Sequence, residues 1–400
     1  MFQFVFRRSR TWPARRYGLR DVAAQKLLAA VGAETVKRRA LNVIPAESKS
    51  FYDRTRGARK VIVVDPGFLG DTVHLIPALW EIKDHYPGAE LHLLSSRLGC
   101  EVARLAPCVD QTWPIELDPA KRTIREQWSL VRRLRRERFD VAFNFSGADR
   151  SIFLTALTGA PNRVAYQGGR RHFWNRWLAR EWILPASESL PIFEQHRRTL
   201  TACGFSVKPP RFDLRVNDAD RAWAAANAPR GGVHFSLNSA NPLKEWPVEH
   251  YATLIQSLLR EYPTTPMLAS ASAKPREQSR VQALAAAVAD ARLTVLPPGL
   301  TIGQLAGVLE QNRLHFGPDS GVLHLALALG VPTASLFRDL PGLEKWSPAL
   351  PGHRRLVAAC ACAGQRAAPC EAQGRAQCLA RISPAQVDVE IAEILRMTLS

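Results

Sequence analysis

A short polar turn followed by an apolar helix lies within residues 316–337, and its residue types suit the binding of an anion. Asp319 and Ser320 are good helix N-cap residues, and Gly330 ends the helix before a second apolar run. The first backbone N–H groups of such a helix have no partner within the helix, so they can bind a phosphate group. His324 lies one turn further along and can face the same pocket. From this stretch alone, a phosphate site and a plain cap on a core helix are both open interpretations.

Two other polar side chains lie where a loop follows a predicted strand. Lys244 lies in the polar loop over residues 238–245, where a lysine can bind phosphate or simply be solvated. Asp71 follows Gly70 in the turn after an apolar run. By itself this pattern indicates a carboxylate that caps the next helix, although a carboxylate in a turn can also act as a general base.

Four of the seven cysteines lie close together near the C-terminus, in the pattern Cys-x-Cys-x7-Cys-x7-Cys. Four thiols in one loop can hold a zinc or iron ion. The spacing differs from the Cys-x2-Cys pairs of common zinc sites, so ordinary reduced thiols stay an open alternative. The candidate ligands of a structural zinc or iron site are Cys360, Cys362, Cys370 and Cys378.

Apolar strand-like runs and amphipathic helices alternate along most of the chain, beginning with a strand over residues 60–65 and a helix over 72–85. Such alternation predicts an α/β fold with parallel sheets covered by helices on both faces. The pattern loosens around residues 205–230 and starts again with a strand over 233–237. The two halves share an architecture without a detectable sequence repeat. The predicted segments are a basic N-terminal extension (1–59), a first domain (60–228), a second domain (229–358) and a Cys-rich loop with a C-terminal helix (359–400).

The chain carries a formal net charge of +18, which favours a polyanionic partner such as a phosphorylated substrate, an anionic membrane or nucleic acid. Residues 1–60 hold fifteen Lys and Arg against four acidic residues, and five arginines gather on one predicted helix over residues 132–138. A short amphipathic helix over residues 21–32 can lie on a membrane surface or pack on the neighbouring domain. No apolar run reaches the roughly 18–20 residues that span a bilayer. We therefore expect a cytosolic protein.

Four segments in order resemble glycosyltransferase family 9, the lipopolysaccharide heptosyltransferases. The first is a strand, a Gly-Asp turn and a Pro-containing helix over residues 61–79, and the second spans residues 149–164. The third is the loop over residues 241–251 with its Lys-x-Trp-Pro sequence, and the fourth is the Asp-Ser-Gly-x-x-His sequence that begins at Asp319. One such motif is weak evidence, whereas four in the family's order are specific.

This resemblance implies the GT-B fold, in which two Rossmann-like domains face each other across a cleft. The family transfers heptose from ADP-heptose to the inner core of lipopolysaccharide, with inversion of the anomeric carbon and without a metal or other cofactor in catalysis. Asp71 matches the family's general base, and Lys244 matches the lysine that binds the donor diphosphate. The residues that the resemblance places at the substrate site are Gly70, Lys244, Glu277, Asp319, Ser320, Gly321 and His324.

Two details of the predicted site need explanation. A carboxylate at a helix N-terminus is stabilised in its charged form, so we expect Asp71 to be a weak base. Such a base suffices if the proton leaves late, once the new C–O bond has largely formed. Pro318 and Arg338 depart from the family pattern near the predicted donor pocket, which leaves the donor sugar open.

The resemblance and the charge together predict a peripheral protein on the cytoplasmic face of a bacterial inner membrane, with no nucleic-acid partner. Alternatives within the family are heptose transfer to a protein such as an autotransporter, or the use of another nucleotide sugar. A basic nucleic-acid-binding protein would explain the charge, but the sequence contains no recognisable nucleic-acid module. A dehydrogenase needs Gly-x-Gly-x-x-Gly after the first strand, and residues 66–70 lack that spacing.

Overall fold

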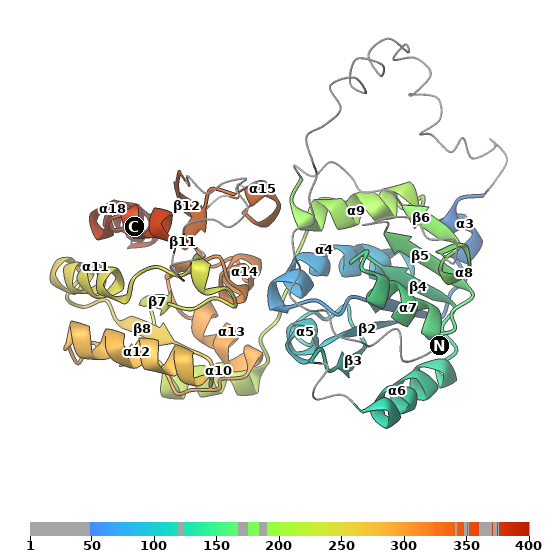
Figure 1. Cartoon of the computed structure of the whole chain (residues 1–400), viewed down its shortest axis with the longest axis horizontal. Helices are drawn as coiled ribbons and strands as arrows, with labels where there is room; N and C mark the ends of the chain where they lie inside the picture. Colours follow the sequence, from blue (N-terminus) through green and yellow to red (C-terminus); the bar gives the residue numbers. More distant parts are fainter. Residues whose placement is uncertain are drawn as a thin grey trace, which may run out of the picture.

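The computed structural model describes residues 49–118, 123–166, 175–183, 190–340, 342–347, 350, 352–359, 370, 374 and 376–399. These residues form two domains that lie side by side, each built on one six-stranded sheet with helices packed on it (Figure 1). Every strand pair in both sheets is parallel. The prediction of an α/β fold with two parallel-sheet domains is confirmed.

The first sheet has the strand order β3-β2-β1-β4-β5-β6, so that β1 and β4 are neighbours at its centre. Val61 and Val63 of β1 pack in one hydrophobic cluster, whereas Ile62 and Val64 pack in another. Alternate side chains of a strand point to opposite faces, so this sheet is covered on both sides. Its strands are β1 (Lys60–Val64), β2 (Glu90–Ser96), β3 (Gln111–Ile115), β4 (Val141–Asn144), β5 (Asn162–Tyr166) and β6 (Glu181–Ile183).

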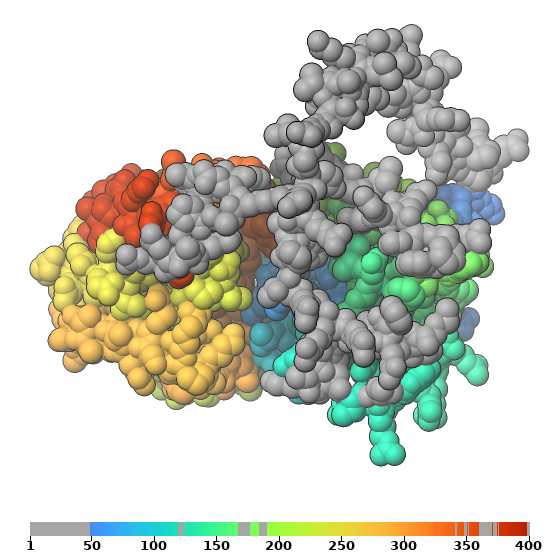
Figure 2. Space-filling view, viewed as in Figure 1, coloured from blue at the N-terminus to red at the C-terminus, as the bar shows by residue number. Residues whose placement is uncertain are grey.

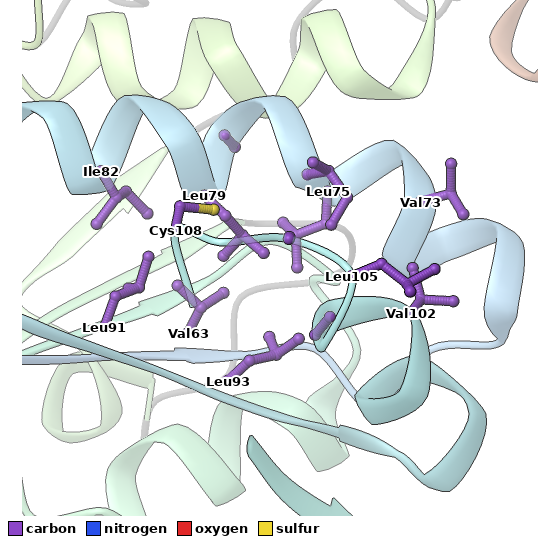
Figure 3. Close-up of a cluster of buried hydrophobic side chains, with 14 of the residues drawn as sticks. Val63, Val73, Leu75, Leu79, Ile82, Leu91, Leu93, Val102, Leu105 and Cys108 are labelled. Atoms are coloured by element: carbon purple, nitrogen blue, oxygen red, sulfur yellow. The ribbon is translucent and has the colours of Figure 1, made fainter. Parts of the chain in front are cut away.

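The helix α4 (Leu69–His85) connects the core of the first domain to the second domain. Its apolar side chains, including Leu75, Leu79 and Ile82, pack over Val63 of the sheet (Figure 3). The helix predicted over residues 72–85 is thus confirmed and begins three residues earlier. The other helices of this part of the chain are α3 (Phe51–Thr55), α5 (Arg97–Ala103), α6 (Ile124–Arg136), α7 (Asp149–Leu157), α8 (Asn175–Leu178) and α9 (Ile192–Ala202).

The second sheet repeats the topology of the first. Its order is β12-β11-β10-β7-β8-β9, which becomes the order of the first sheet when it is numbered from its own first strand. Both domains therefore have the doubly wound arrangement of Rossmann folds. Its strands are β7 (Val233–Ser236), β8 (Met267–Ser270), β9 (Leu293–Val295), β10 (Leu314–Pro318), β11 (Thr333–Arg338) and β12 (His353–Ala358).

The unit β10-α14-β11 contains the strand, turn, helix and strand predicted over residues 316–337. Gly330 follows α14 with a φ of 72°, a left-handed conformation that suits glycine at a helix end. The other helices of this half are α10 (Asp218–Asn227), the 3-10 helix η3 (Pro242–Lys244), α11 (Val248–Glu261), α12 (Pro275–Val288), α13 (Ile302–Glu310), α14 (Gly321–Ala328), α15 (Leu343–Trp346), α17 (Gln377–Arg381) and α18 (Pro384–Leu399).

The two domains adjoin each other (Figure 2), and they contact each other directly through α4 and α14. One hydrophobic cluster continues from the first domain into the second. Two glycines allow this close approach. A Cβ atom on Gly70 would lie 2.8 Å from Cδ2 of His324, and a Cβ atom on Gly321 would lie 2.8 Å from Cδ2 of Leu69. Both glycines were predicted to bind substrate, and the structure gives each of them a packing role between the domains.

Four observations bear on the remaining predictions. The predicted helix over residues 21–32 lies outside the described residues. The helix α10 packs on α13 of the second domain. It lies just before the predicted domain boundary at residues 228 and 229, and this boundary stays a prediction. Ser383 caps α18 as predicted, because its Oγ accepts a hydrogen bond from Gln386 N–H at 3.3 Å. Within the described ranges, no helix has both the length and the apolar character that a membrane span needs.

Candidate functional site

Polar side chains gather where the strand order of each sheet reverses. This point lies between β1 and β4 in the first sheet and between β7 and β10 in the second. Loops at the carboxyl ends of such strands leave a crevice that is the usual ligand site of this fold. Asp71 follows β1, whereas Lys244 follows β7 and Asp319 follows β10. The predicted site residues are therefore divided between two such points, one in each domain.

Lys244, Asp319 and His324 form a connected polar group in the second domain. Lys244 Nζ lies 2.5 Å from Asp319 Oδ2, and His324 Nε2 lies 3.5 Å from Asp319 Oδ1. Burial raises the pKa of Asp319. The hydrogen bond from His324 and the charge of Lys244 lower this pKa by more than burial raises it, so the pKa lies below its ordinary value. Asp319 is therefore a carboxylate at neutral pH, and it joins the three predicted residues because it contacts both Lys244 and His324.

This polar group continues into the first domain through two histidines. His324 Nδ1 lies 3.1 Å from Nε2 of His74, a residue of α4. If the Nε2 proton of His324 points to Asp319, its Nδ1 accepts a hydrogen bond from His74 Nε2–H. Burial lowers the pKa of His74 well below its ordinary value, and the charges of His324 and His196 lower it further. Trp346 packs against both rings of the pair. Sequence analysis missed His74, although it lies one helical turn after the predicted general base.

The start of α14 has unsatisfied polar groups. Ser320 occupies the N-cap position as predicted, but its hydroxyl makes no capping hydrogen bond. Its Oγ is buried and has no hydrogen-bond partner in the part of the chain that the structure describes. A ligand oxygen could accept hydrogen bonds from this hydroxyl and from the first N–H groups of α14. The geometry therefore fits an anion beside the Lys244–Asp319 pair.

Asp71 lies in the first turn of α4, where its Oδ2 accepts a hydrogen bond from Phe68 N–H at 2.6 Å. The expectation that the helix N-terminus makes Asp71 a weak base is wrong. Burial raises the pKa of Asp71, and this effect exceeds the lowering caused by the Phe68 N–H and by the charges of His324 and Lys244. Asp71 therefore binds a proton more tightly than an ordinary helix cap, which suits a general base.

A cavity of about 370 Å³ lies beside Asp71 and is lined by residues of the first domain and by Trp346 of the second. Asp65, the residue after β1, lines this cavity and is only 4% exposed. Burial raises the pKa of Asp65 to about 7, with a further contribution from the charge of Asp71. Sequence analysis treated Asp65 only as a strand end. Four other lining residues are aromatic: Phe68, Phe145, Tyr166 and Trp346.

The loop that carries Lys244 is held in place by α12. Arg276 of this helix donates hydrogen bonds to both carboxylate oxygens of Glu245, at 2.7 and 2.9 Å, and one to the backbone oxygen of Ser239 at 3.1 Å. Ser239 N–H also donates to Glu245 Oε1 at 2.9 Å. Sequence analysis missed these residues, which position the lysine without being ligands themselves.

Glu277, predicted to bind the donor ribose, is buried at the start of α12. Its Oε2 accepts a hydrogen bond from Ser272 N–H at 3.2 Å, and its Oε1 lies 3.4 Å from Lys274 Nζ. Among the described residues, no contact joins Glu277 to Lys244 or Asp319. Its role at the ribose stays a prediction.

The two departures from the family pattern lie close to the same edge of the second sheet. Pro318 is the last residue of β10 and pairs with Leu336 of the neighbouring strand. Arg338 is the last residue of β11. Both residues thus end strands on the edge that carries Asp319, as expected for residues near the donor pocket.

The predicted metal site lies only partly within the described residues, since Cys360 and Cys362 fall outside them. Cys370 and Cys378 are buried in one hydrophobic cluster of the second domain. Cys370 Sγ accepts a hydrogen bond from Gln377 N–H at 3.4 Å. In the described part of the chain, no group of three or more His, Cys, Asp or Glu side chains could hold a metal ion. The zinc or iron site stays a prediction.

Known proteins with similar sequences and structures agree with this arrangement. A model described as glycosyltransferase family 9 (heptosyltransferase) matches residues 127–373. Lipopolysaccharide heptosyltransferase 1 of Pseudomonas aeruginosa is 25% identical over 290 residues, which cover 70% of this chain and 78% of that protein. Lipopolysaccharide heptosyltransferase 2 of Escherichia coli is 23% identical over 315 residues, which cover 74% and 87%. The solved structure of E. coli ADP-heptose lps heptosyltransferase II matches with a TM-score of 0.68 and 21% identity, over 85% of this chain and 100% of that one. The predicted GT-B fold is confirmed.

Proposed function

The chain belongs to glycosyltransferase family 9, and from this membership we propose that it transfers heptose from ADP-heptose to the inner core of lipopolysaccharide, with inversion of the anomeric carbon. One observation carries the proposal. A buried base, Asp71, lies near enough to Lys244 and His324 of the other domain for their charges to lower its pKa. Transfer from a nucleotide sugar to a hydroxyl group needs this combination, a base for the acceptor and fixed positive charge for the leaving group.

In the proposed step, an acceptor hydroxyl lies in the cavity beside Asp71. Its oxygen forms a bond to the anomeric carbon of the donor, on the face opposite the ADP. Its proton moves to Asp71, and the bond from the anomeric carbon to the phosphate oxygen breaks with its electron pair on ADP. Because Phe68 N–H binds Oδ2, the other carboxylate oxygen of Asp71 is the one that takes the proton. The raised pKa of Asp71 makes it a stronger base than an ordinary helix-capping carboxylate, which favours transfer of the acceptor proton as the C–O bond forms.

The leaving diphosphate is bound by groups of the second domain. Lys244 is already paired with Asp319, so a phosphate oxygen shares or replaces this partner when the donor binds. The buried hydroxyl of Ser320 and the first N–H groups of α14 supply further donors. Because these groups neutralise the developing charge, we propose that catalysis needs no metal ion.

A donor screen tests this function. Calorimetry compares ADP-heptose with ADP-glucose, UDP-sugars and GDP-sugars, and NMR of the product gives the anomeric configuration. We expect the tightest binding for ADP-heptose and an inverted product. Mass spectrometry of core oligosaccharide from a deletion strain identifies the acceptor. Preference for another nucleotide sugar, a retained anomer or transfer to a protein would contradict the proposal.

We also propose that the first domain contacts the anionic cytoplasmic face of the inner membrane through α6. This helix lies on the first domain, away from the second (Figure 1). Arg132, Arg133 and Arg136 are exposed on it, and no arginine of α6 forms an ion pair within the described ranges. Trp128 on the same helix is 46% exposed. Exposed basic and aromatic side chains on one helix are typical of contact with anionic lipid.

Sedimentation with vesicles tests this contact. We expect the full-length chain to bind phosphatidylglycerol vesicles, and phosphatidylcholine vesicles much less. The triple variant Arg132→Glu, Arg133→Glu, Arg136→Glu should lose most of this binding. The control changes two exposed arginines of the second domain, Arg230→Glu and Arg260→Glu, and the loss is compared per reversed charge. Equal losses per reversed charge would assign the effect to net charge instead of α6.

A further inference from the structure

The cavity beside Asp71 holds a second carboxyl group that the proposed step does not use. The backbone of Asp65 is fixed, because its N–H donates to Leu94 O at 3.0 Å and its carbonyl oxygen accepts from Ser95 Oγ at 2.7 Å. The side chain is 4% exposed and lines the cavity. Within the described residues, its carboxyl group has neither a hydrogen-bond donor nor an ion-pair partner. Burial of such a group is unfavourable unless water or a ligand in the cavity supplies the missing partner.

The two carboxyl groups differ in which of them keeps a proton. Asp71 has the Phe68 N–H and the charges of Lys244 and His324, all of which favour its ionised form. Asp65 has none of these, and burial together with the charge of Asp71 raises its pKa to about 7. A single proton in the cavity therefore resides on Asp65. A protonated carboxyl group donates one hydrogen bond and accepts others, which matches a sugar hydroxyl group.

The rest of the cavity lining is partly aromatic and partly polar, with Ser146, Gln195 and His196 as its other polar residues. Phe68, Phe145, Tyr166 and Trp346 offer apolar faces on which the C–H side of a sugar ring can pack. No Lys or Arg belongs to the described lining. A phosphate or carboxylate in this cavity would lie near the charge of Asp71 and would have no cationic partner among the described lining residues, which is unfavourable.

We propose that Asp65 is an acceptor-binding residue, which holds a hydroxyl group next to the reacting one, and that the sugar ring in this cavity is uncharged. This inference rests on the proposed glycosyl transfer and names the substrate class of its acceptor side: a neutral pyranose with neighbouring free hydroxyl groups. Charged groups of a lipopolysaccharide acceptor then lie outside the cavity, where the basic surface of the first domain can bind them.

Binding without the donor gives the first test. Saturation-transfer NMR with the full-length chain compares methyl mannoside, its 6-phosphate and the corresponding uronic acid, which share one ring and differ in charge. The wild type should bind the neutral glycoside about 10-fold more tightly than either anion. Asp65→Leu should weaken binding of the neutral glycoside about 10-fold, whereas Asp65→Asn, which keeps a donor and an acceptor, should stay within about 3-fold. The control Asp218→Asn changes a fully exposed carboxylate on α10 and should bind as the wild type.

Three outcomes of this test overturn the proposal: tighter binding of an anionic glycoside, no binding of the neutral one, or wild-type affinity in Asp65→Leu. Kinetics gives the second test, with ADP-heptose as donor and a neutral heptoside as acceptor. Asp65→Leu should raise the acceptor KM about 10-fold and leave kcat and ADP affinity within about 3-fold. A lower kcat and ADP affinity with an unchanged acceptor KM would show a merely structural role and overturn the proposal. If the wild type uses no nucleotide heptose, the transfer proposal fails, while the NMR comparison still decides whether Asp65 binds a neutral sugar.

Discussion

The two points where strand order reverses share one topology and differ in how their charged groups are satisfied. In the second domain, Asp319 contacts both Lys244 and His324, and its pKa lies below the ordinary value. In the first domain, Asp71 has a backbone N–H partner, and the carboxyl group of Asp65 has none among the described residues. Burial therefore raises the pKa of both. One sheet arrangement thus supports a permanently charged site in one domain and a proton-accepting site in the other.

The most severe test of this contrast removes the base alone. Asp71→Asn should lower kcat about 10²–10⁴-fold, because an amide cannot take the proton of the acceptor hydroxyl. The affinity for ADP should stay near that of the wild type, because the charged site in the second domain is intact. Steady-state kinetics and calorimetry with ADP measure the two quantities.

The control for Asp71→Asn is Asp218→Asn, whose carboxylate is fully exposed. Retained turnover in Asp71→Asn would exclude Asp71 as the base. A parallel loss of ADP affinity would show that Asp71 acts on the donor side, and the separation of the two sites would then fail.

The complementary test removes the cation. Lys244→Gln should weaken ADP binding about 10- to 100-fold, as expected when a charged partner of a phosphate is lost. The acceptor affinity should not change, because Lys244 lies in the other domain. Calorimetry with ADP measures the loss, and Lys208→Gln, an exposed ion-paired lysine of the first domain, is the control. ADP binding as tight as in the wild type would remove Lys244 from the donor site.

Sequence analysis predicted more of the charged site than of the proton-accepting one. The motif residues Lys244, Asp319 and His324 are brought together because they follow neighbouring parallel strands, and strand alternation was visible in the sequence. Asp71 was found, but its pKa was expected in the wrong direction. The sequence around Asp71 shows only that this residue begins a helix. The burial that decides the pKa of Asp71 depends on contacts with the second domain, some 250 residues away in the sequence.

Asp65 and His74 show which signals were overlooked. Asp65 is a charged residue at the end of an apolar run, and the carboxyl end of a central parallel strand is where this fold binds ligands. His74 lies on the face of α4 that meets the second domain, but the contact surface of a helix with another domain is not encoded in its own periodicity. Gly70 and Gly321 belonged to recognised motifs, and only the structure shows that side chains of the opposite domain require them.

Substitution of Gly70 and Gly321 tests whether activity needs close packing between the two domains, which carry the charged site and the proton-accepting site. Gly70→Ala and Gly321→Ala should each destabilise the folded protein by about 1–3 kcal/mol, because each added Cβ overlaps a side chain of the other domain. Urea unfolding measures this loss. Small-angle scattering shows whether the domains separate, and turnover should fall with separation. Gly88→Ala is the matched control, because a Cβ there meets nothing within 4 Å, and its stability should change by less than about 0.5 kcal/mol. Wild-type stability in both interface variants would mean that the domains do not pack this closely.

The smallest expected effect is the pH dependence that Asp65 gives to stability. Its pKa of about 7 in the folded protein lies above the ordinary value of 3.8, so the folded protein binds a proton that the unfolded chain has lost. This stabilisation is complete below about pH 4 and disappears as the pH rises through 7, with a loss of about 1.4 kcal/mol between pH 6 and pH 8. Urea unfolding at both pH values should show about 1 kcal/mol more loss in the wild type than in Asp65→Asn, because the histidines that titrate in this range are common to both. Equal losses would show that Asp65 is already ionised at pH 6, and the contrast between the two sites would then depend on Asp71 alone.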